Sequence, residues 1–363
     1  MIDWAGIHVD KGFRMLYLPL SLLSLIYGAG VAIRLKRARS GEKKALPGFT
    51  VSIGNLTAGG TGKTPATCMM AEWAKGEGYN VAVLSRGYGS KNREKLTIVS
   101  DGENVLAGPE QAGDEPYLMA CRLPGVPVII AKDRCLAGLT AIDRFKSSFF
   151  ILDDGYQHLA LKRDLDLLLL DAASPFGNGR LLPRGPLREP VSEAARADAV
   201  ILTRAGSLTG GKGSDNDLGG LLNIKPLFMC EHLPDKVIFP AGKMKFDPSF
   251  LKGKRVMAFA GIARPDSFRD TLVSLGADIV SFRSFPDHYP FSGHEIKGLR
   301  EERDKSGADF LITTEKDWVR ASDMLSADVS ALYLTVRFDF LSNKEGFFRM
   351  VNERIKSKKG EIS

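Results

Sequence analysis

Residues 49–65 read FTVSIGNLTAGGTGKTP and carry the strongest signal in the chain. An apolar run at 49–54 has the composition of a strand, a glycine-rich turn follows it, and the stretch after Thr64 is compatible with a helix. In a phosphate-binding loop, glycines let backbone N–H groups surround phosphate oxygens at a helix N-terminus. The segment therefore predicts a nucleotide-binding domain of the P-loop NTPase type. A purely structural glycine turn is the alternative.

The residue types inside this loop predict a role for each. We expect Lys63 to reach the β- and γ-phosphates of a nucleotide and the hydroxyl of Thr64 to ligate Mg²⁺. The strict pattern G-x-x-x-x-G-K-[ST] has glycine at position 57, where this chain has Thr57. The predicted cofactor-binding residues are Gly59, Gly60, Thr61, Gly62, Lys63 and Thr64.

An acidic pair, Asp153 and Asp154, directly follows another apolar run at 148–152. One carboxylate at such a strand end can hold Mg²⁺ through a water molecule. Taken alone, an aspartate in this position is usually a turn or cap residue. Because a phosphate-binding loop precedes the pair, we favour a metal site formed by Thr64, Asp153 and Asp154. Adjacent side chains point in different directions, so the second carboxylate is expected to have another task.

On both sides of the loop, short apolar runs alternate with longer mixed segments. Near-continuous Val, Ile and Leu runs are typical of parallel strands that helices cover on both faces. The pattern predicts a doubly wound, mostly parallel α/β sheet with a second, smaller α/β domain and an N-terminal membrane-associated helix. Helices are expected at 64–77 and 134–146. The expected strands are 49–54, 80–85, 127–131, 148–152, 165–170, 198–203, 226–231, 255–260, 278–283, 309–313 and 332–338.

These patterns divide the chain into five parts. A Gly-, Ser- and Asp-rich stretch at 205–220 indicates a loop before a linker. The predicted parts are an apolar and basic membrane-associated segment (1–46), a P-loop nucleotide-binding domain (47–225), a linker (226–250), a smaller C-terminal α/β domain (251–335) and a C-terminal segment with a basic tail (336–363).

The positive charge of the chain is confined to its ends. The 363 residues are 44% hydrophobic and 26% charged, which is typical of a globular protein, and the formal net charge is +7. Residues 1–46 contribute +5 and residues 349–363 contribute +3, so the body carries −1. Nucleic-acid binding needs concentrated Lys and Arg, so this body is not expected to bind nucleic acid. The four cysteines form no zinc pattern and fit a reducing compartment.

An uncharged run from Met15 to Ile33 lies between basic residues and is nearly long enough to span a bilayer. Four interpretations remain open: a cleaved signal peptide, a spanning helix, a helix lying in one leaflet, and a buried core helix. Bases after residue 33 would meet anionic head groups and keep the body on the cytoplasmic side of a membrane.

Motifs spread along most of the chain resemble the tetraacyldisaccharide 4'-kinase family of lipid A synthesis, in which threonine at position 57 is normal. The matching stretches are SIGNLTAGGTGKTP (52–65), LSRGYG (84–89), GDEP (113–116), KDR (132–134), LDDGYQH (152–158), GRLLPRGPLRE (179–189), AGIARP (260–265), FPDHYPF (285–291) and TTEKD (313–317).

The resemblance implies an ATP-dependent kinase that phosphorylates the 4'-hydroxyl of an acylated glucosamine disaccharide 1-phosphate. ATP and Mg²⁺ are the implied cofactors, and the cytoplasmic face of the bacterial inner membrane is the implied location. The expected partners are the lipid substrate and an anionic membrane surface, with no obligate protein partner. A lipid substrate stays in the bilayer, so the catalytic body must come to it, and the apolar N-terminal segment suits that need.

The resemblance also points to the catalytic residues. Asp114 would accept the proton of the attacking hydroxyl; its alternative role is the N-cap of a helix that begins at Glu115. His288, from the predicted second domain, would sharpen this base or stabilise transition-state charge, and would need the domains to close. Lys63 completes the predicted catalytic set.

Further residues near the matched motifs are candidates for substrate binding. Arginine binds phosphate through a two-pronged guanidinium, which suits the lipid 1-phosphate or the transferred group. Lys316 and Asp317 match the family, but the sequence indicates no role for them, and His8, His232 and His294 have no comparable context. The predicted substrate-binding residues are Ser85, Arg134, His158 and Arg188, with Arg184 as a further arginine.

Three rival functions predict different features. A P-loop GTPase needs an N-K-x-D motif, whereas the nearest string here is Thr314-Glu315-Lys316-Asp317, and a metallochaperone needs a Cys/His cluster. A membrane-tethered ATP-binding regulator would transfer no phosphate to a lipid. We therefore favour the kinase.

Overall fold

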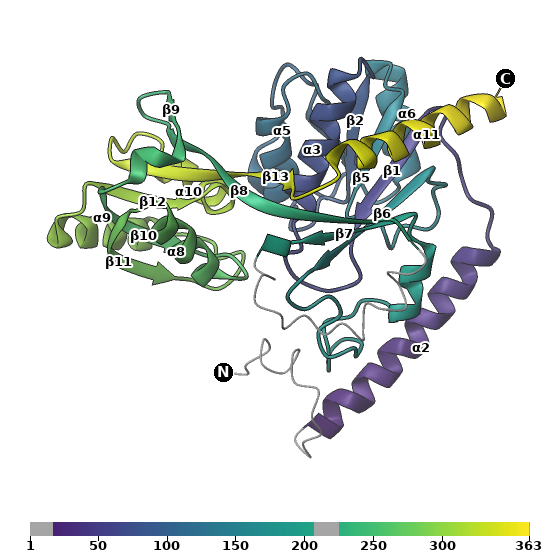
Figure 1. Ribbon diagram of the computed structural model, residues 1–363, viewed down its shortest axis with the longest axis horizontal. Coiled ribbons are helices and arrows are strands. Elements are labelled where there is room, and N and C mark those ends of the chain that lie inside the picture. The colour runs from purple at the N-terminus through teal and green to yellow at the C-terminus, as the bar shows by residue number, and fades with distance from the viewer. Residues whose placement is uncertain (1–16, 207–224, 363) are drawn as a thin grey trace.

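A computed structural model describes residues 17–206 and 225–362 of the chain (Figure 1). Its strands form one 13-stranded sheet in the order β11-β10-β12-β13-β8-β7-β6-β1-β5-β2-β4-β3, with β9 paired to β8. The expected strands all occur within a residue or two of their predicted starts. The helices are α2 (Leu18–Ser40), α3 (Lys63–Gly76), α4 (Pro109–Ala112), α5 (Asp114–Arg122), α6 (Arg134–Phe145), η2 (Val191–Arg196), η4 (Pro248–Leu251), α8 (Pro265–Ser274), α9 (Gly293–Ser306), α10 (Glu315–Leu325) and α11 (Lys344–Ile362).

One half of the sheet, here called the P-loop half, has the predicted doubly wound architecture. Its strands β1, β2 and β4 to β7 are parallel and fully buried, and helices cover both faces, as near-continuous apolar runs require (Figure 1). Of the described strands in this half, the edge strand β3 alone is antiparallel, and it was not predicted from the sequence. The strands are β1 (Phe49–Gly54), β2 (Val81–Ser85), β3 (Leu96–Ser100), β4 (Val128–Ala131), β5 (Phe149–Asp153), β6 (Leu165–Asp171) and β7 (Ala199–Thr203).

The other half, here called the second unit, contains three more parallel strands and the helices α8, α9 and α10. Alternating strand residues face two apolar clusters, one on each side of the sheet. Its elements follow each other as strand, helix, strand, which agrees with the expected second αβ pattern. The strands are β10 (Arg255–Ala260), β11 (Asp278–Ser284) and β12 (Phe310–Thr314).

A long two-stranded ribbon joins the halves. The start of β8 (Leu227–Phe239) lies parallel to β7, and the rest of β8 pairs with antiparallel β13 (Ala331–Phe340). A short strand, β9 (Met244–Phe246), folds back on the far end of β8. The segment 226–250, expected as a linker, is therefore mainly extended strand. The sequence indicated only the first residues of β8 because Pro234 and neighbouring charges interrupt its apolar pattern.

The C-terminal helix α11 returns to the P-loop half. Phe347, Val351 and Ile355 are buried in the same apolar cluster as β1 and α3, and Phe348 stacks on Trp73 with ring centroids 4.7 Å apart. The basic tail contributes ion pairs to this contact, among them Lys358 with Asp164 at 2.5 Å and Arg354 with Asp198 at 2.7 Å. Part of the C-terminal positive charge thus fixes a helix to the body.

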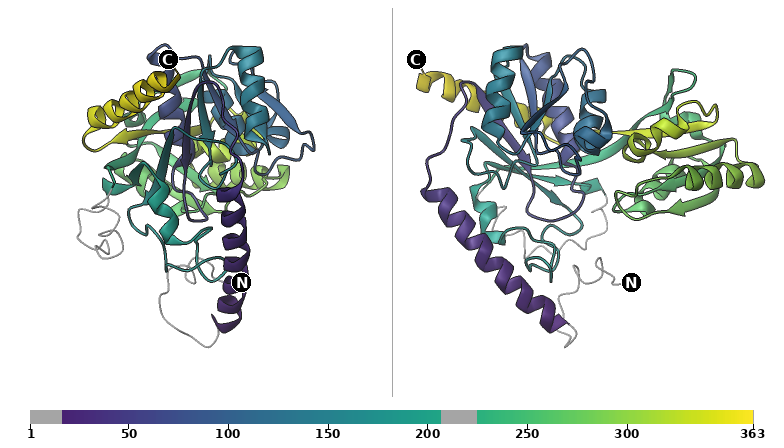
Figure 2. Two further views of the ribbon diagram at one scale, coloured as in Figure 1. Left: turned by 90° about the vertical axis from the view of Figure 1, so that its right-hand side faces the viewer. Right: turned by 180° about the vertical axis from the view of Figure 1, so that it is seen from behind.

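Helix α2 is a long rod at the edge of the P-loop half, remote from the second unit (Figures 1 and 2). Apart from Val31 and Leu35, which pack on Leu159, its apolar side chains are mostly exposed, with Leu25 at 72%. It is therefore not a buried core helix. Among the described residues it alone has the length and hydropathy of a membrane-crossing helix. The predicted segment begins before residue 17, outside the described residues.

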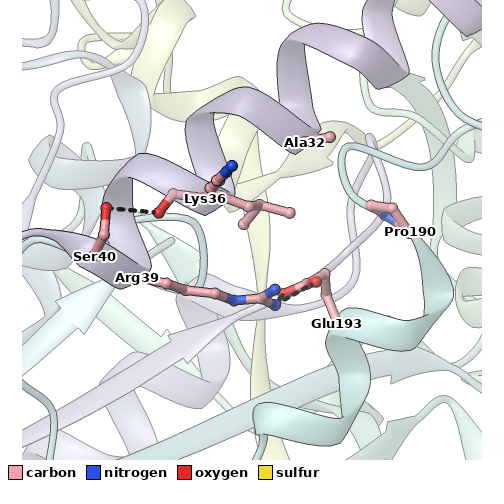
Figure 3. A pocket seen from close by; sticks show the side chains of 7 residues that line it. Ala32, Lys36, Arg39, Ser40, Pro190 and Glu193 are labelled. Atoms are coloured by element: carbon pink, nitrogen blue, oxygen red, sulfur yellow. Dashed lines mark hydrogen bonds and ion pairs between the residues drawn. The ribbon is translucent and has the colours of Figure 1, made fainter.

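Polar contacts hold the C-terminal part of α2 against the body. Arg34 pairs with Glu189 at 2.8 Å and Arg39 with Glu193 at 2.6 Å. Figure 3 shows the second pair at the edge of an open pocket between α2 and η2, which is lined by Ala32, Leu35, Lys36, Arg39, Ser40, Pro190 and Glu193. Two of the predicted membrane-facing bases therefore bind carboxylates of the protein itself.

Replacing Phe347 by alanine tests whether α11 belongs to the core. Phe347 has no exposed surface, and a Phe→Ala change at such a site costs about 3–5 kcal/mol. We expect the free energy of unfolding in urea, followed by tryptophan fluorescence, to fall by about that amount. The matched variant Lys356→Ala on the exposed face of α11 should change it by less than about 0.5 kcal/mol. Equal effects of the two variants would contradict the packing described here.

Candidate functional site

The predicted site residues converge at one edge of the sheet. Strand β5 lies between β1 and β2, and all three are parallel, so their carboxyl ends lie side by side. The glycine-rich loop follows β1, Asp153 ends β5 and Ser85 ends β2. Parallel pairing thus brings together residues that are distant in sequence, such as Ser85 and Asp153, which lie 68 positions apart.

The loop leads directly into helix α3, which begins at Lys63. Gly62, the residue before the helix, has a φ of 85°, a left-handed conformation that favours glycine. Lys63 is buried, and its Nζ lies 3.4 Å from Asn55 Oδ1 and 3.6 Å from Asp154 Oδ1. This geometry, a helix N-terminus with an adjacent lysine, suits a bound phosphate chain.

Asp153 is the buried member of the acidic pair. Its two carboxylate oxygens accept hydrogen bonds from the hydroxyls of Thr67, at 3.3 Å, and Ser85, at 3.0 Å. Burial, together with the charges of Glu115 and Asp154, raises the pKa of Asp153 to about 7. Ser85, predicted to contact substrate, donates its hydroxyl hydrogen bond to this carboxylate, and substrate binding by Ser85 stays a prediction.

Asp154 is more exposed and is surrounded by positive charge. Arg188 Nη1 donates to both of its oxygens, at 3.1 and 2.9 Å. Although partial burial acts in the opposite direction, the charges of Lys63 and Arg188 hold the pKa of Asp154 below its ordinary value. The two adjacent carboxylates therefore differ in environment, and the separate task expected for the second one stays a prediction. The guanidinium of Arg188, predicted to bind substrate, is bound to a carboxylate in this structure.

Carboxylate and hydroxyl oxygens at this edge fit the needs of Mg²⁺. Mg²⁺ typically takes one or two carboxylates from a protein and completes its shell with phosphate oxygens and water. Accordingly, no preformed cluster of three His, Cys, Asp or Glu ligands occurs within residues 17–206 and 225–362. Thr64, Asp153 and Asp154 could therefore hold the ion once a nucleotide supplied the remaining ligands.

Asp114 and His288 meet across the two halves of the molecule. His288 Nδ1 lies 3.2 Å from Asp114 Oδ2. Asp114 is the first residue of α5, and the residue that precedes the helix, Gly113 with φ 85°, makes no side-chain cap. The alternative role of Asp114 as an N-cap is therefore wrong. The carboxylate remains available for a contact outside its own helix.

Two other predicted substrate contacts are buried or half-buried. Arg134 is 3% exposed and donates to the backbone carbonyls of Ala131 and Lys132. Burial lowers the pKa of Arg134 to about 10. Burial likewise lowers the pKa of His158 to about 4, so its imidazole is neutral near pH 7. Arg184 is also buried and lies over the ring of Tyr17. Substrate binding by these side chains stays a prediction.

The structure adds two residues that the sequence analysis passed over. Glu115, next to Asp114, pairs with Lys316 at 2.9 Å, and despite the opposing effect of burial, Lys316 and Lys63 lower its pKa. His232, on β8, lies against the loop, and a Cβ at Gly62 would overlap its imidazole. Its buried Nε2 has no hydrogen-bond partner among the described residues. Nothing in the apolar pattern around His232 marks it, because the contact depends on how the ribbon crosses the loop.

Comparison with known proteins places this geometry in a family. A sequence model of the family tetraacyldisaccharide-1-P 4'-kinase matches residues 16–356. The tetraacyldisaccharide 4'-kinase of Syntrophus aciditrophicus (strain SB) is 42% identical over 361 residues, which cover 96% of each chain. That of Pelobacter propionicus is 43% identical over 311 residues, 86% of this chain and 84% of its own.

A solved structure agrees with these sequence matches. The chain is similar to LpxK from Aquifex aeolicus, crystallised in complex with ATP, with a TM-score of 0.76 and 32% identity. The match covers 94% of this chain and all of that one. The fold, the loop and the sequence matches agree along nearly the whole length, and the chain therefore belongs to the tetraacyldisaccharide-1-P 4'-kinase family.

Proposed function

We propose that this protein transfers the γ-phosphate of ATP to the 4'-hydroxyl of a tetraacyldisaccharide 1-phosphate at the cytoplasmic face of the bacterial inner membrane. The observation that carries the proposal is the contact of Asp114 with His288, in which a carboxylate and an imidazole from the two halves of the molecule meet. Asp114 is adjacent in sequence to Glu115, and against the opposing effect of burial the charges of Lys316 and Lys63 lower the pKa of Glu115, so Glu115 and the loop lysine belong to one electrostatic site. A hydroxyl bound between Asp114 and a nucleotide on the loop would have both a proton acceptor and a phosphate donor.

In the proposed reaction, Lys63 and the N-terminus of α3 neutralise the phosphate chain of ATP. The 4'-oxygen forms a bond to the γ-phosphorus while the bond to the bridging oxygen of ADP breaks. The hydroxyl proton passes to the carboxylate of Asp114, and His288 on the other oxygen orients that carboxylate. Thr64, Asp153 and Asp154 would hold Mg²⁺, which would supply further charge neutralisation at the phosphates.

The exposed part of α2 suits a membrane-bound substrate. Its outward apolar residues can enter the interface, while Lys36 and Arg37 remain exposed next to them. Arg34 and Arg39 already pair with Glu189 and Glu193, so Lys36 and Arg37 are the bases of α2 best placed for anionic head groups. The proposal thus assigns separate tasks to neighbouring bases of the same helix.

The direct test is incubation with ATP, Mg²⁺ and tetraacyldisaccharide 1-phosphate in detergent micelles, with the lipid followed by mass. We expect a gain of one phosphate and a preference for ATP over GTP. Unchanged lipid beside an active control enzyme would exclude the kinase and favour an ATP-binding regulator. Preference for GTP would favour the rival P-loop class.

Replacing Asp114 by asparagine tests the proton acceptor. The amide keeps the size of the carboxylate but cannot accept the proton, and loss of a general base typically costs about 10²–10⁴-fold in rate. We expect kcat to fall by that factor while ATP affinity, measured by titration calorimetry, stays within about twofold. Retention of more than a tenth of the wild-type kcat would show that another group accepts the proton.

Replacing Gly62 by alanine tests the geometry of the loop. The left-handed backbone and the imidazole of His232 both oppose a side chain there. We expect ATP affinity to fall at least about tenfold, since each such strain costs on the order of 1–3 kcal/mol. Gly76→Ala, at the far end of α3 where a Cβ has open space, is the matched control and should bind ATP like wild type. Normal ATP affinity of Gly62→Ala would contradict the described loop.

Removing the charges of Lys36 and Arg37 tests membrane contact. Each base near an anionic surface contributes about 1 kcal/mol, so the double alanine variant should bind vesicles of phosphatidylcholine with phosphatidylglycerol at least about tenfold more weakly. The control Lys243→Ala with Lys245→Ala removes equal charge from an exposed hairpin of the second unit. Equal losses in a vesicle sedimentation assay would contradict binding through α2.

A further inference from the structure

The motif TTEKD at 313–317 matched the family but was left without a role, and the structure places its aspartate at the centre of a network. Asp317 has no exposed surface. Its Oδ2 accepts hydrogen bonds from the backbone N–H of Gly261, at 3.0 Å, and from the hydroxyl of Thr314, at 2.7 Å. Its Oδ1 accepts a hydrogen bond from Arg320 Nη2, one turn further along α10. A buried carboxylate satisfied in this way holds a cation in a fixed place.

Arg320 extends this network to the proposed base. Its side chain is 7% exposed, its Nη2 also donates to the carbonyl of Gly261 at 2.9 Å, and its Nη1 lies 3.4 Å from Asp114 Oδ2. One guanidinium therefore touches three segments: its own helix α10, the loop after β10, and α5 of the P-loop half. The planar fork of arginine directs two separate nitrogens, Nη1 and Nη2, at different partners, whereas lysine has a single nitrogen at one point.

The carbonyl of Gly261, which Arg320 contacts, also binds the segment that contains His288. The backbone N–H of His288 donates to the carbonyl of Gly261 at 3.2 Å, and His288 has a φ of 58°, in the sparsely populated left-handed region. Arg320 thus contacts Asp114 directly and reaches His288 through a carbonyl that both share. The neighbouring Lys316 adds a parallel contact, because its Nζ binds Glu115 and lies 3.5 Å from His288 Nε2.

The contacts of Asp114 with His288 and Arg320 involve one of its two carboxylate oxygens. His288 and Arg320 both approach Oδ2. Within the described residues no protein group bonds to Oδ1, so that oxygen remains the one open to a substrate hydroxyl. A carboxylate fixed through one oxygen presents the other in a defined direction, and alignment within about 1 Å is worth up to about 10²-fold in rate.

We propose that Arg320, held by Asp317, is a positioning residue that fixes the carboxylate of Asp114 against His288 and thereby aims its second oxygen at the substrate hydroxyl. The inference rests on the proposed role of Asp114 as proton acceptor. It assigns a task to the TTEKD motif: Asp317 anchors the arginine, and Lys316 anchors the adjacent Glu115. The alternative is that Arg320 only stabilises the contact between the two halves.

The variant Arg320→Lys keeps the charge but removes the fork. We expect kcat to fall about 10- to 100-fold while KM for ATP and for the lipid changes less than about threefold, because alignment is lost and binding is not. Arg303→Lys is the matched control, since Arg303 is 14% exposed and pairs with the buried Asp328 in the same unit but lies outside the proposed site. Its kcat should stay within about twofold of wild type. A normal kcat for Arg320→Lys would overturn the proposal.

A double-mutant cycle separates positioning from general stability. In an Asp114→Asn background, measured under single-turnover conditions, Arg320→Lys should lower the rate less than about twofold further, because the group it positions is already inactive. If the two losses instead multiply, Arg320 acts independently of Asp114 and the proposal is wrong. If Asp114→Asn alone keeps normal turnover, the proposed base is wrong and the positioning role falls with it.

The variant Asp317→Asn tests the same proposal in case Arg320→Lys does not fold. Asp317→Asn preserves the shape of the anchor and removes the charge that holds Arg320. If Arg320→Lys fails to fold, Asp317→Asn, checked for wild-type ATP affinity and circular dichroism, should show the same pattern of lowered kcat with unchanged KM. Normal kcat in that folded variant would equally overturn the proposal.

Discussion

Crowding of three carboxylates beside a phosphate-binding loop is the constraint around which the molecule is arranged. Asp153, Asp154 and Glu115 lie close enough to influence one another's pKa. Their repulsion is balanced by cations from different parts of the chain: Lys63 from the loop, Arg188 from the segment beside α2, and Lys316 from the second unit. Among the residues that the structure describes, no cation contacts Asp153 directly, and Asp153 is the member whose pKa is raised. A nucleotide with its metal ion would enter a site whose charges already hold the surrounding elements in place.

The same arrangement links the membrane-facing helix to the site. The hydroxyl of Tyr27 on α2 donates to the carbonyl of Arg188 at 3.1 Å, and Arg34 pairs with the neighbouring Glu189. The side chain of Arg188 in turn binds Asp154. Arg188 thus links helix α2, which has the exposed apolar surface, to the acidic pair. On the opposite side, the β8–β13 ribbon and the contacts of α10 with α5 connect the second unit to the same edge of the sheet.

Features encoded by local pattern were predictable from the sequence. The glycine-rich loop, the parallel strands and the acidic pair at the end of β5 follow from apolar runs, glycine spacing and the rule that parallel strands end at one edge.

Strand β3 was missed because it is a short antiparallel edge strand after a polar stretch, and most of β8 was missed because Pro234 and charged residues break its pattern. The contact of Asp114 with His288 could be inferred only from family resemblance, since a separation of 174 residues leaves no local signal. The roles of Glu115, His232 and Arg320 depend on how the halves meet, which no periodicity encodes.

Asp114, supplied by one half of the molecule and oriented from the other, is proposed to face the attacking hydroxyl. The decisive measurement of this placement is a crystal structure of the protein with a non-hydrolysable ATP analogue, Mg²⁺ and tetraacyldisaccharide 1-phosphate. We expect the 4'-oxygen within hydrogen-bond distance of Asp114 Oδ1 and in line with the γ-phosphorus, with His288 still on Oδ2. A 4'-oxygen bound instead to Asp153 or Asp154, with Asp114 turned away from the nucleotide, would contradict it.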